Sequence, residues 1–182
     1  MNILKTAIAD LIIIEPKIWG DERGYFMETY SKNVFENNGL NFDWIQDNEA
    51  FSTRGVLRGL HYQTSDVAQT KLVRVAQGEI LDVVVDLRKD SLSYGKSFSI
   101  VLSDTNKKQL LVPRGLAHGY VVLSASALFL YKVDNPYIPA KEAGILYNDP
   151  ALEIDWILEE KDLIISEKDK VQPIFKNHTP YN

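Results

Sequence analysis

Two of the three histidines lie where an imidazole could take part in acid–base chemistry. His61 and His118 both follow glycine-rich stretches amid apolar residues, whereas His178 lies in a polar segment and is expected to be inert. Imidazole changes its charge near neutral pH, so it can act as a general base or acid. A core histidine bonded to the backbone would show the same local pattern, so both interpretations of each residue stay open at this point.

The segment Gly55–Gln63 contains two glycines, one just before the predicted strand Val56–Gln63 and the other, Gly59, inside it. Strict alternation would place Arg58 and His61 on opposite faces of that strand. A bulge at Gly59 would instead bring both side chains to one face, and glycine inside a strand is typical of bulges and of close ligand approach.

A lysine and a tyrosine are further candidates. Lys71 opens the apolar stretch Lys71–Ala76, and its ammonium could either reach water or stabilise an oxyanion. Tyr131 comes late in the apolar stretch Ala127–Val133. Its phenol could be a core group with a solvated hydroxyl, or a general acid that donates a proton into a cavity.

A metal site is not supported by these residue types. The chain has no cysteine, and only two histidines lie in candidate positions, far apart in the sequence. A protein zinc site usually needs three or four such ligands. We therefore predict no bound metal.

The elements that must position these side chains are mostly short strands separated by turn residues. The predicted strands are Leu11–Glu15, Tyr25–Tyr30, Trp44–Ser52, Val56–Gln63, Lys71–Ala76, Glu79–Leu87, Ser97–Ser103, Gln109–Val112, Gly119–Leu123 and Ala127–Val133, with a further one possible at Leu152–Trp156. A short helix is predicted after Ser31, and a terminal turn or short helix at Ser166–Lys170. Many strands with almost no helix predict an all-β sandwich or closed barrel.

The stretch Glu79–Arg88 alternates between two kinds of face. One face carries Leu81, Val83, Val85 and Leu87, and the other carries Ile80, Asp82, Val84 and Asp86. A barrel that binds a ligand needs polar residues among apolar ones on its inner face. A sheet with one face in solvent would give the same pattern, so alternation alone leaves both arrangements open.

Length and charge restrict the class of protein. The chain has 182 residues, which suits a single domain over residues 1–182, and a net charge of −5, which disfavours a nucleic-acid partner. All arginines lie before residue 115, so an anionic small ligand could still find a cationic pocket. The apolar stretch Leu11–Ile14 is too short for a membrane span or a signal peptide, and the lack of cysteine fits a cytoplasmic location.

The stretch Pro113–Tyr120 resembles the second motif of the cupin superfamily. The wider set of segments resembles one cupin family, the dTDP-4-dehydrorhamnose 3,5-epimerases. The matching segments are Asp21–Glu28, Gln46–Asn48, Gly55–Gln63, Lys71–Val75, Asp82–Arg88, Pro113–Gly119, Tyr131–Lys132, Glu142, Asn148–Pro150 and Ser166–Asp169. This resemblance implies a cupin-type double-stranded β-helix, or jelly-roll barrel, with a few short helices.

The resemblance also implies roles for particular residues. His61 matches the catalytic base and Asp169 the carboxylate that orients it. Tyr131 matches the general acid on the opposite face of the sugar, and Lys71 the group that faces the C4 oxygen. Residues that match substrate-binding positions are Arg23, Glu28, Gln46, Asp47, Asn48, Arg58, Lys71, His118 and Glu142.

The implied reaction is inversion at C3 and C5 of dTDP-4-dehydro-6-deoxy-D-glucose, which gives dTDP-4-dehydro-L-rhamnose for dTDP-rhamnose biosynthesis. The resemblance implies no cofactor, and a homodimer with Arg23 near its interface. The cupin metal pair His-x-His reads His61-Tyr62-Gln63 here, so its second ligand is missing.

Three alternatives remain open from the sequence. Relatives that invert only C3 or only C5 share the same motifs, and the departures at Glu49–Ser52 and Tyr147 leave the preferred sugar undecided. A metal-dependent cupin enzyme is a second alternative. A sugar-nucleotide binding module without activity is the third, and the joint presence of His61, Tyr131 and Asp169 argues against it.

Overall fold

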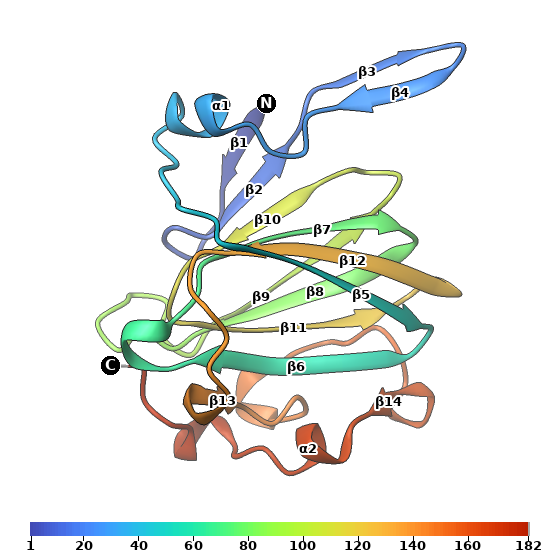
Figure 1. Cartoon of the computed structure of the whole chain (residues 1–182). Coiled ribbons are helices and arrows are strands. Elements are labelled where there is room, and N and C mark those ends of the chain that lie inside the picture. The colour runs from blue at the N-terminus through green and yellow to red at the C-terminus, as the bar shows by residue number, and fades with distance from the viewer. Residues whose placement is uncertain (182) are drawn as a thin grey trace.

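Two six-stranded β-sheets face each other and enclose a lumen (Figure 1). The computed structural model describes residues 1–181. The first sheet has the order β1 (Asn2–Lys5), β2 (Ile12–Glu15), β10 (Gln109–Val112), β7 (Lys71–Gln77), β12 (Ser126–Val133) and β5 (Gln46–Thr53). The second has the order β13 (Glu142–Gly144), β6 (Val56–Gln63), β11 (Leu116–Val122), β8 (Glu79–Asp86) and β9 (Ser97–Ser103), with β14 (Ile164–Ile165) paired to β6. This arrangement confirms the predicted double-stranded β-helix.

Strand β8 shows how alternation builds the two sides of the second sheet. Ile80 and Val84 point into the lumen, where they pack with residues of the opposite sheet such as Val73. Leu81 and Val83 point the other way and are equally buried. Both faces of β8 are therefore buried. Asp82 shares its face with Ile80 and Val84, so its side chain is on the lumen side.

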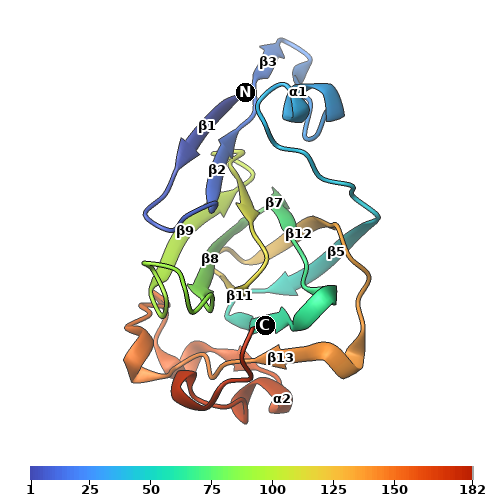
Figure 2. The same ribbon diagram turned by 90° about the vertical axis from the view of Figure 1, so that its left-hand side faces the viewer.

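The segment after residue 144 covers the outer face of the second sheet. Its helices are short: α2 (Glu167–Lys170) and the 3₁₀ turns η3 (Pro150–Leu152), η4 (Glu160–Asp162) and η5 (Phe175–Asn177). Figure 2 shows this orange and red part of the chain gathered below the strands. Its apolar side chains, Trp156 among them, pack against the face of Leu81 and Val83.

The predicted strand at Leu152–Trp156 is wrong. The chain forms η3 and then an irregular path there, because Asp149 accepts a hydrogen bond from the Ala151 N–H and Pro150 occupies the first position of the turn. Trp156 is buried and its indole N–H donates to the Tyr147 carbonyl. The local apolar pattern thus reflects packing onto the sheet and not strand pairing.

The N-terminal region contributes two strands that the sequence did not predict. Strand β1 pairs with β2, and β3 (Ile18–Asp21) pairs with β4 (Gly24–Met27) in a hairpin that projects away from the barrel (Figure 1). Helix α1 (Lys32–Glu36) follows Ser31 as predicted. The remaining 3₁₀ turns are η1 (Ser65–Val67) and η2 (Pro139–Lys141).

Among residues 1–181, no helix has the length and apolar character that a membrane-spanning helix needs.

Candidate active site

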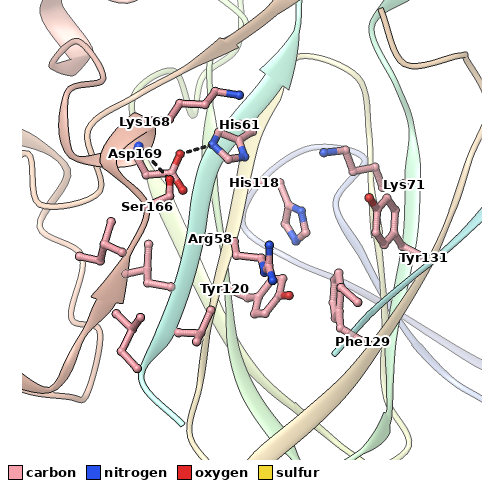
Figure 3. Close-up of a pocket in the computed structure, with 15 residues that line it drawn as sticks. Arg58, His61, Lys71, His118, Tyr120, Phe129, Tyr131, Ser166, Lys168 and Asp169 are labelled. Carbon is pink, nitrogen blue, oxygen red and sulfur yellow. Dashed lines mark hydrogen bonds and ion pairs between the residues drawn. The ribbon is translucent and has the colours of Figure 1, made fainter. Parts of the chain in front are cut away.

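A cavity of about 550 Å³ opens between the two sheets, a size typical of small-molecule sites. Six of the predicted functional side chains line it together: Arg58, His61, Lys71, His118, Tyr131 and Asp169 (Figure 3). The second sheet supplies one wall, with His61 and His118, and the first sheet supplies the opposite wall, with Lys71 and Tyr131.

His61 and Asp169 form a hydrogen-bonded pair at one wall of the cavity. The distance from His61 Nε2 to Asp169 Oδ1 is 2.6 Å. An ionised carboxylate only accepts hydrogen bonds, so Nε2 carries the proton and Nδ1 keeps its lone pair. Figure 3 shows the second ring nitrogen turned toward the cavity, where it can take a proton from a ligand.

The C-terminal segment brings Asp169 to this position. Strand β14 pairs in parallel with β6, with Ile165 opposite Leu57, and the chain then turns into α2. Ser166 caps this short helix by accepting the Asp169 N–H at 3.1 Å. Burial alone would raise the pKa of Asp169. Hydrogen bonds from His61, from the Gly59 backbone N–H and from Ser166 outweigh burial and lower the pKa of this carboxyl.

A bulge in β6 places Arg58 and His61 on the same face, as the glycine pattern predicted. In the pairing of β6 with β11, His61 lies opposite His118 and Arg58 lies opposite Tyr120, so three steps on one strand match two on the other. Gly59 has a φ of +137°, and a Cβ there would lie 2.5 Å from the Gly119 Cα. Only glycine fits this close approach, and the positions of both candidate site residues on β6 depend on it.

Tyr131 and Lys71 lie on the first sheet, across the cavity from His61. Burial raises the pKa of Tyr131, so its phenol stays protonated and can donate at neutral pH. Burial lowers the pKa of Lys71 to about 8, although the carboxylates of Asp82 and Glu142 act in the opposite direction. The Lys71 ammonium is therefore still largely charged at neutral pH and is suited to stabilise a negative oxygen.

His118 is part of a second histidine–carboxylate pair. Its Nε2 lies 3.0 and 2.9 Å from the two carboxylate oxygens of Asp82, and Asp82 is fully buried on the lumen face of β8. Asp82 was not among the predicted site residues. The alternation of β8, in which an aspartate shares a face with Ile80 and Val84, was the signal that could have identified it.

Glu142 lies on β13 and contacts Lys168, a residue of the cavity wall. It accepts hydrogen bonds from Lys168 and from the Tyr137 hydroxyl, the latter at 2.8 Å. These two partners outweigh the effect of burial and lower the pKa of Glu142. Lys168 itself lines the cavity and was missed from the sequence, although it immediately precedes Asp169 in a segment that resembles the family.

The predicted binding residues of β5 lie beside the cavity and not inside it. Asn48 is directly opposite Tyr131 in the pairing of β5 with β12, so the two side chains share a face. The Gln46 amide donates to Asn48 at 2.7 Å. Asp47 points to the other face and forms an ion pair with Lys132 at 2.7 Å.

Arg23 and Glu28 are not brought to this cavity. Arg23 lies in the turn of the β3–β4 hairpin, where it pairs with Asp21, and Glu28 follows the end of β4. Both side chains are exposed on the part of the chain that projects from the barrel.

The donor groups of the cavity do not form a metal centre. Within the described chain, no group of three or more histidine, aspartate or glutamate side chains is arranged to hold a metal ion. His61 and His118 are opposite each other on β6 and β11, but each is bonded to its own carboxylate.

The lumen of this double-stranded β-helix therefore holds an imidazole on one wall and a protonated phenol on the other, with an ammonium beside the phenol. Together the fold and the site define a cupin-type enzyme whose cavity holds groups of the kinds that transfer protons.

Comparison with known proteins identifies the family. The family model described as dTDP-4-dehydrorhamnose 3,5-epimerase matches residues 5–177. A dTDP-4-dehydrorhamnose 3,5-epimerase of Methanothermobacter thermautotrophicus is 51% identical over 170 residues, which cover 93% of this chain and 91% of that protein. The chain belongs to the dTDP-4-dehydrorhamnose 3,5-epimerase family, and it is an isomerase.

Two solved structures are similar throughout. The epimerase of Elizabethkingia anophelis has a TM-score of 0.92 and 49% identity, with 97% of each chain covered. The epimerase of Legionella pneumophila, solved with dTDP-4-keto-L-rhamnose, has a TM-score of 0.93 and 44% identity, with 100% of this chain and 98% of that chain covered.

Proposed function

We propose that this isomerase converts dTDP-4-dehydro-6-deoxy-D-glucose to dTDP-4-dehydro-L-rhamnose by inverting C3 and C5. The observation that supports this most directly is the position of His61 and Tyr131 on opposite walls of one cavity (Figure 3). Inversion of a carbon requires that a proton leave from one face and return to the other. A base and an acid that face each other across a sugar-sized space meet that requirement.

The first step is removal of a proton next to the ketone. The C4 carbonyl acidifies the C–H bonds at C3 and C5, and His61 Nδ1 takes one of these protons. The electron pair of the broken bond moves into the carbonyl and forms an enolate with negative charge on O4. The Lys71 ammonium stabilises that charge, and Asp169 stabilises the imidazolium that forms.

The second step returns a proton from the opposite side. The Tyr131 phenol donates its proton to the carbon, the carbonyl re-forms, and the configuration of that carbon is inverted. His61 then releases its proton to solvent and Tyr131 regains one. The same cycle at the second carbon gives the double epimer. The ketone is already present in the substrate, so the cycle requires no redox cofactor.

Cationic and polar groups around the cavity account for binding of the nucleotide. Arg58 lies at the cavity edge and is exposed enough to reach a diphosphate. Lys168 and His118 border the same space, and Glu142 accepts a hydrogen bond from Lys168. We assign these groups to substrate binding and reserve the proton-transfer roles for His61 and Tyr131.

Proton exchange in heavy water tests the proposal. We expect solvent deuterium to enter both C3 and C5 during turnover, as measured by NMR of the sugar ring. Exchange at one carbon only would make the chain a single-site epimerase and would refute double inversion. An enzyme inactivated by a chelator and restored by one metal would contradict the metal-free mechanism.

We further propose that the chain works as a homodimer. The β3–β4 hairpin exposes Trp19, Tyr25 and Phe26, and 65% of the Phe26 surface is accessible. A two-stranded hairpin is hardly stable by itself, and exposed aromatic groups are typical of interfaces. If the hairpin packs on a second copy, Arg23 can reach the partner's cavity, which accounts for its distance from the cavity of its own chain.

Mixing of two inactive variants tests this arrangement. Arg23→Ala and His61→Asn are purified separately, denatured together and refolded. If Arg23 acts across the interface, mixed dimers contain one complete site and regain activity. Absence of recovery, together with a monomeric mass in light scattering, would refute the dimer.

The cytoplasmic location remains a prediction from the sequence. Fractionation of cells that express the chain tests it, and we expect the protein in the cytoplasmic fraction.

A further inference from the structure

Tyr120 is a second tyrosine in the wall of the cavity. Packing accounts for the presence of an aromatic ring at this position. The residue lies on β11, two positions after His118, and only 5% of its surface is accessible. Its ring packs on Phe129 with a centroid distance of 4.5 Å. A phenylalanine would make the same contact, so packing does not account for the hydroxyl.

The Tyr120 hydroxyl is buried without a hydrogen-bond partner among residues 1–181. The other buried tyrosines are satisfied: the Tyr62 hydroxyl donates to the Thr179 carbonyl, and the Tyr147 hydroxyl donates to Glu160 at 3.0 Å. An unpartnered buried hydroxyl destabilises a folded protein, because it loses its bonds to water. The Tyr120 hydroxyl therefore needs a partner that the chain itself does not supply.

The position of Tyr120 shows where that partner would be. In the strand pairings it lies opposite Arg58 on β6 and opposite Asp82 on β8, so its side chain faces the lumen. Figure 3 shows its hydroxyl turned toward the space between the two walls. Burial first, and then the nearby Tyr120 phenol, raise the pKa of Tyr131, which places the two phenols in one neighbourhood.

We propose that Tyr120 is a specificity-determining residue whose phenol O–H donates a hydrogen bond to a hydroxyl group of the sugar ring. This inference rests on the proposed function. A neutral donor suits a neutral oxygen, whereas the enolate oxygen and the diphosphate are better matched by Lys71 and Arg58. In a 4-keto-6-deoxy sugar joined to a nucleotide at C1, only C2 and C3 carry free hydroxyls. The contact is therefore with one of these two groups.

Tyr120→Phe removes the hydroxyl and keeps the ring. We expect the melting temperature of the free variant to be unchanged or higher, since no bond within the chain is lost. We expect kcat/KM for the complete substrate to fall by about three- to tenfold, the effect of one neutral hydrogen bond. Binding of dTDP, which lacks the sugar, should be unchanged in calorimetry.

Deoxy substrates identify the contacted group. C5 inversion is measured with the 2-deoxy and the 3-deoxy analogue for wild type and for Tyr120→Phe. With the analogue that lacks the contacted hydroxyl, the two enzymes should have the same kcat/KM, whereas the other analogue should preserve the difference. Tyr62→Phe is the matched control: it should lower the melting temperature and leave kcat/KM unchanged.

Several outcomes would overturn the inference: an unchanged kcat/KM with the complete substrate, an equal loss with all three sugars, or weakened binding of dTDP alone. These outcomes are separate from failure of the proposed function. If His61→Asn abolishes turnover while Tyr120→Phe is indistinguishable from wild type, only the inference about Tyr120 is wrong.

Discussion

His61 Nε2 and Asp169 Oδ1 lie 2.6 Å apart, although 108 positions separate them in the chain. The pair exists because β14 runs alongside β6 and delivers α2 to the end of the cavity wall. The carboxylate selects the tautomer in which Nδ1 is free to accept a proton. The predictions that follow test this pair and the groups that face it.

Replacement of Asp169 by asparagine should slow the reaction without removing the side chain. An amide can donate to His61 Nε2 and thereby favour the tautomer with the proton on Nδ1. We expect kcat to fall by about 10²–10⁴-fold, as when a histidine base loses its orienting carboxylate. Steady-state kinetics measures this loss, and calorimetry with dTDP should show binding that is nearly unchanged. A variant with wild-type kcat would show that the pair is only structural.

His61→Asn should remove the base itself. We expect turnover to fall by about 10³-fold or more, since general base catalysis contributes on this scale. His178→Asn is the control, because His178 stacks on Phe175 away from the cavity and should leave turnover unchanged. Deuterium exchange at both carbons should disappear in His61→Asn. Persistent exchange would assign the base to another group.

Tyr131→Phe should separate proton removal from inversion. His61 and Lys71 remain in place, so the enolate can still form and take up solvent deuterium from the His61 side. We expect exchange into the recovered substrate to continue while formation of the epimerised product falls by about 10²-fold or more. NMR follows exchange and product in one sample. Loss of both in parallel would show that Tyr131 is needed for enolate formation.

The pH dependence of kcat/KM should report on Lys71. Because its pKa is lowered to about 8, the ammonium is lost as the pH rises through that value, and kcat/KM should decline on the alkaline side. Asp82 and Glu142 both raise the pKa of Lys71. Asp82→Asn should therefore move the decline to lower pH, whereas Lys71→Met should greatly reduce kcat/KM.

A second variant on β8 serves as the control for this pH profile. Glu79 lies at the exposed start of β8, so Glu79→Gln removes one negative charge from the same strand outside the cavity. This variant should keep the wild-type profile. An alkaline limb that stays in place in Asp82→Asn would show that Asp82 does not set the charge of Lys71.

Gly59→Ala should damage both the fold and the site. A Cβ at this position meets Gly119 Cα at 2.5 Å and the backbone carries a φ of +137°, so strand β6 must move away from β11. We expect a loss of about 1–3 kcal/mol in the free energy of unfolding, together with a large loss of kcat. Gly39→Ala is the matched control, because Gly39 also has a positive φ but has open space around it. Chemical denaturation compares the two, and an equal loss would exclude the close approach as the cause.

More of the candidate site's residues than of its tertiary contacts could be predicted from the sequence. Residue types alone marked His61 and Tyr131 as groups capable of proton transfer, Lys71 as a group that could stabilise an oxyanion, and Gly59 as a bulge. The family resemblance added Asp169, whose local context is only a polar segment near the end of the chain. Lys168 and Asp82 were missed because a lysine in a polar segment and an aspartate in an alternating strand usually face solvent. Their positions depend on which elements cover them.

The alternation of β8, the turn residues and the glycine pattern of β6 are local properties. They were enough to predict an all-β fold, either a sandwich or a barrel, and to mark candidate reactive groups, while the family resemblance favoured the barrel. The period of side chains along a strand is two, and this is enough to assign faces, but it does not tell which face is inside. Only the tertiary structure decided that the Asp82 face lines the lumen, that Asp169 meets His61 and that Arg23 stands apart on a projecting hairpin. These relationships arise from pairing and packing between distant segments, which no local pattern encodes.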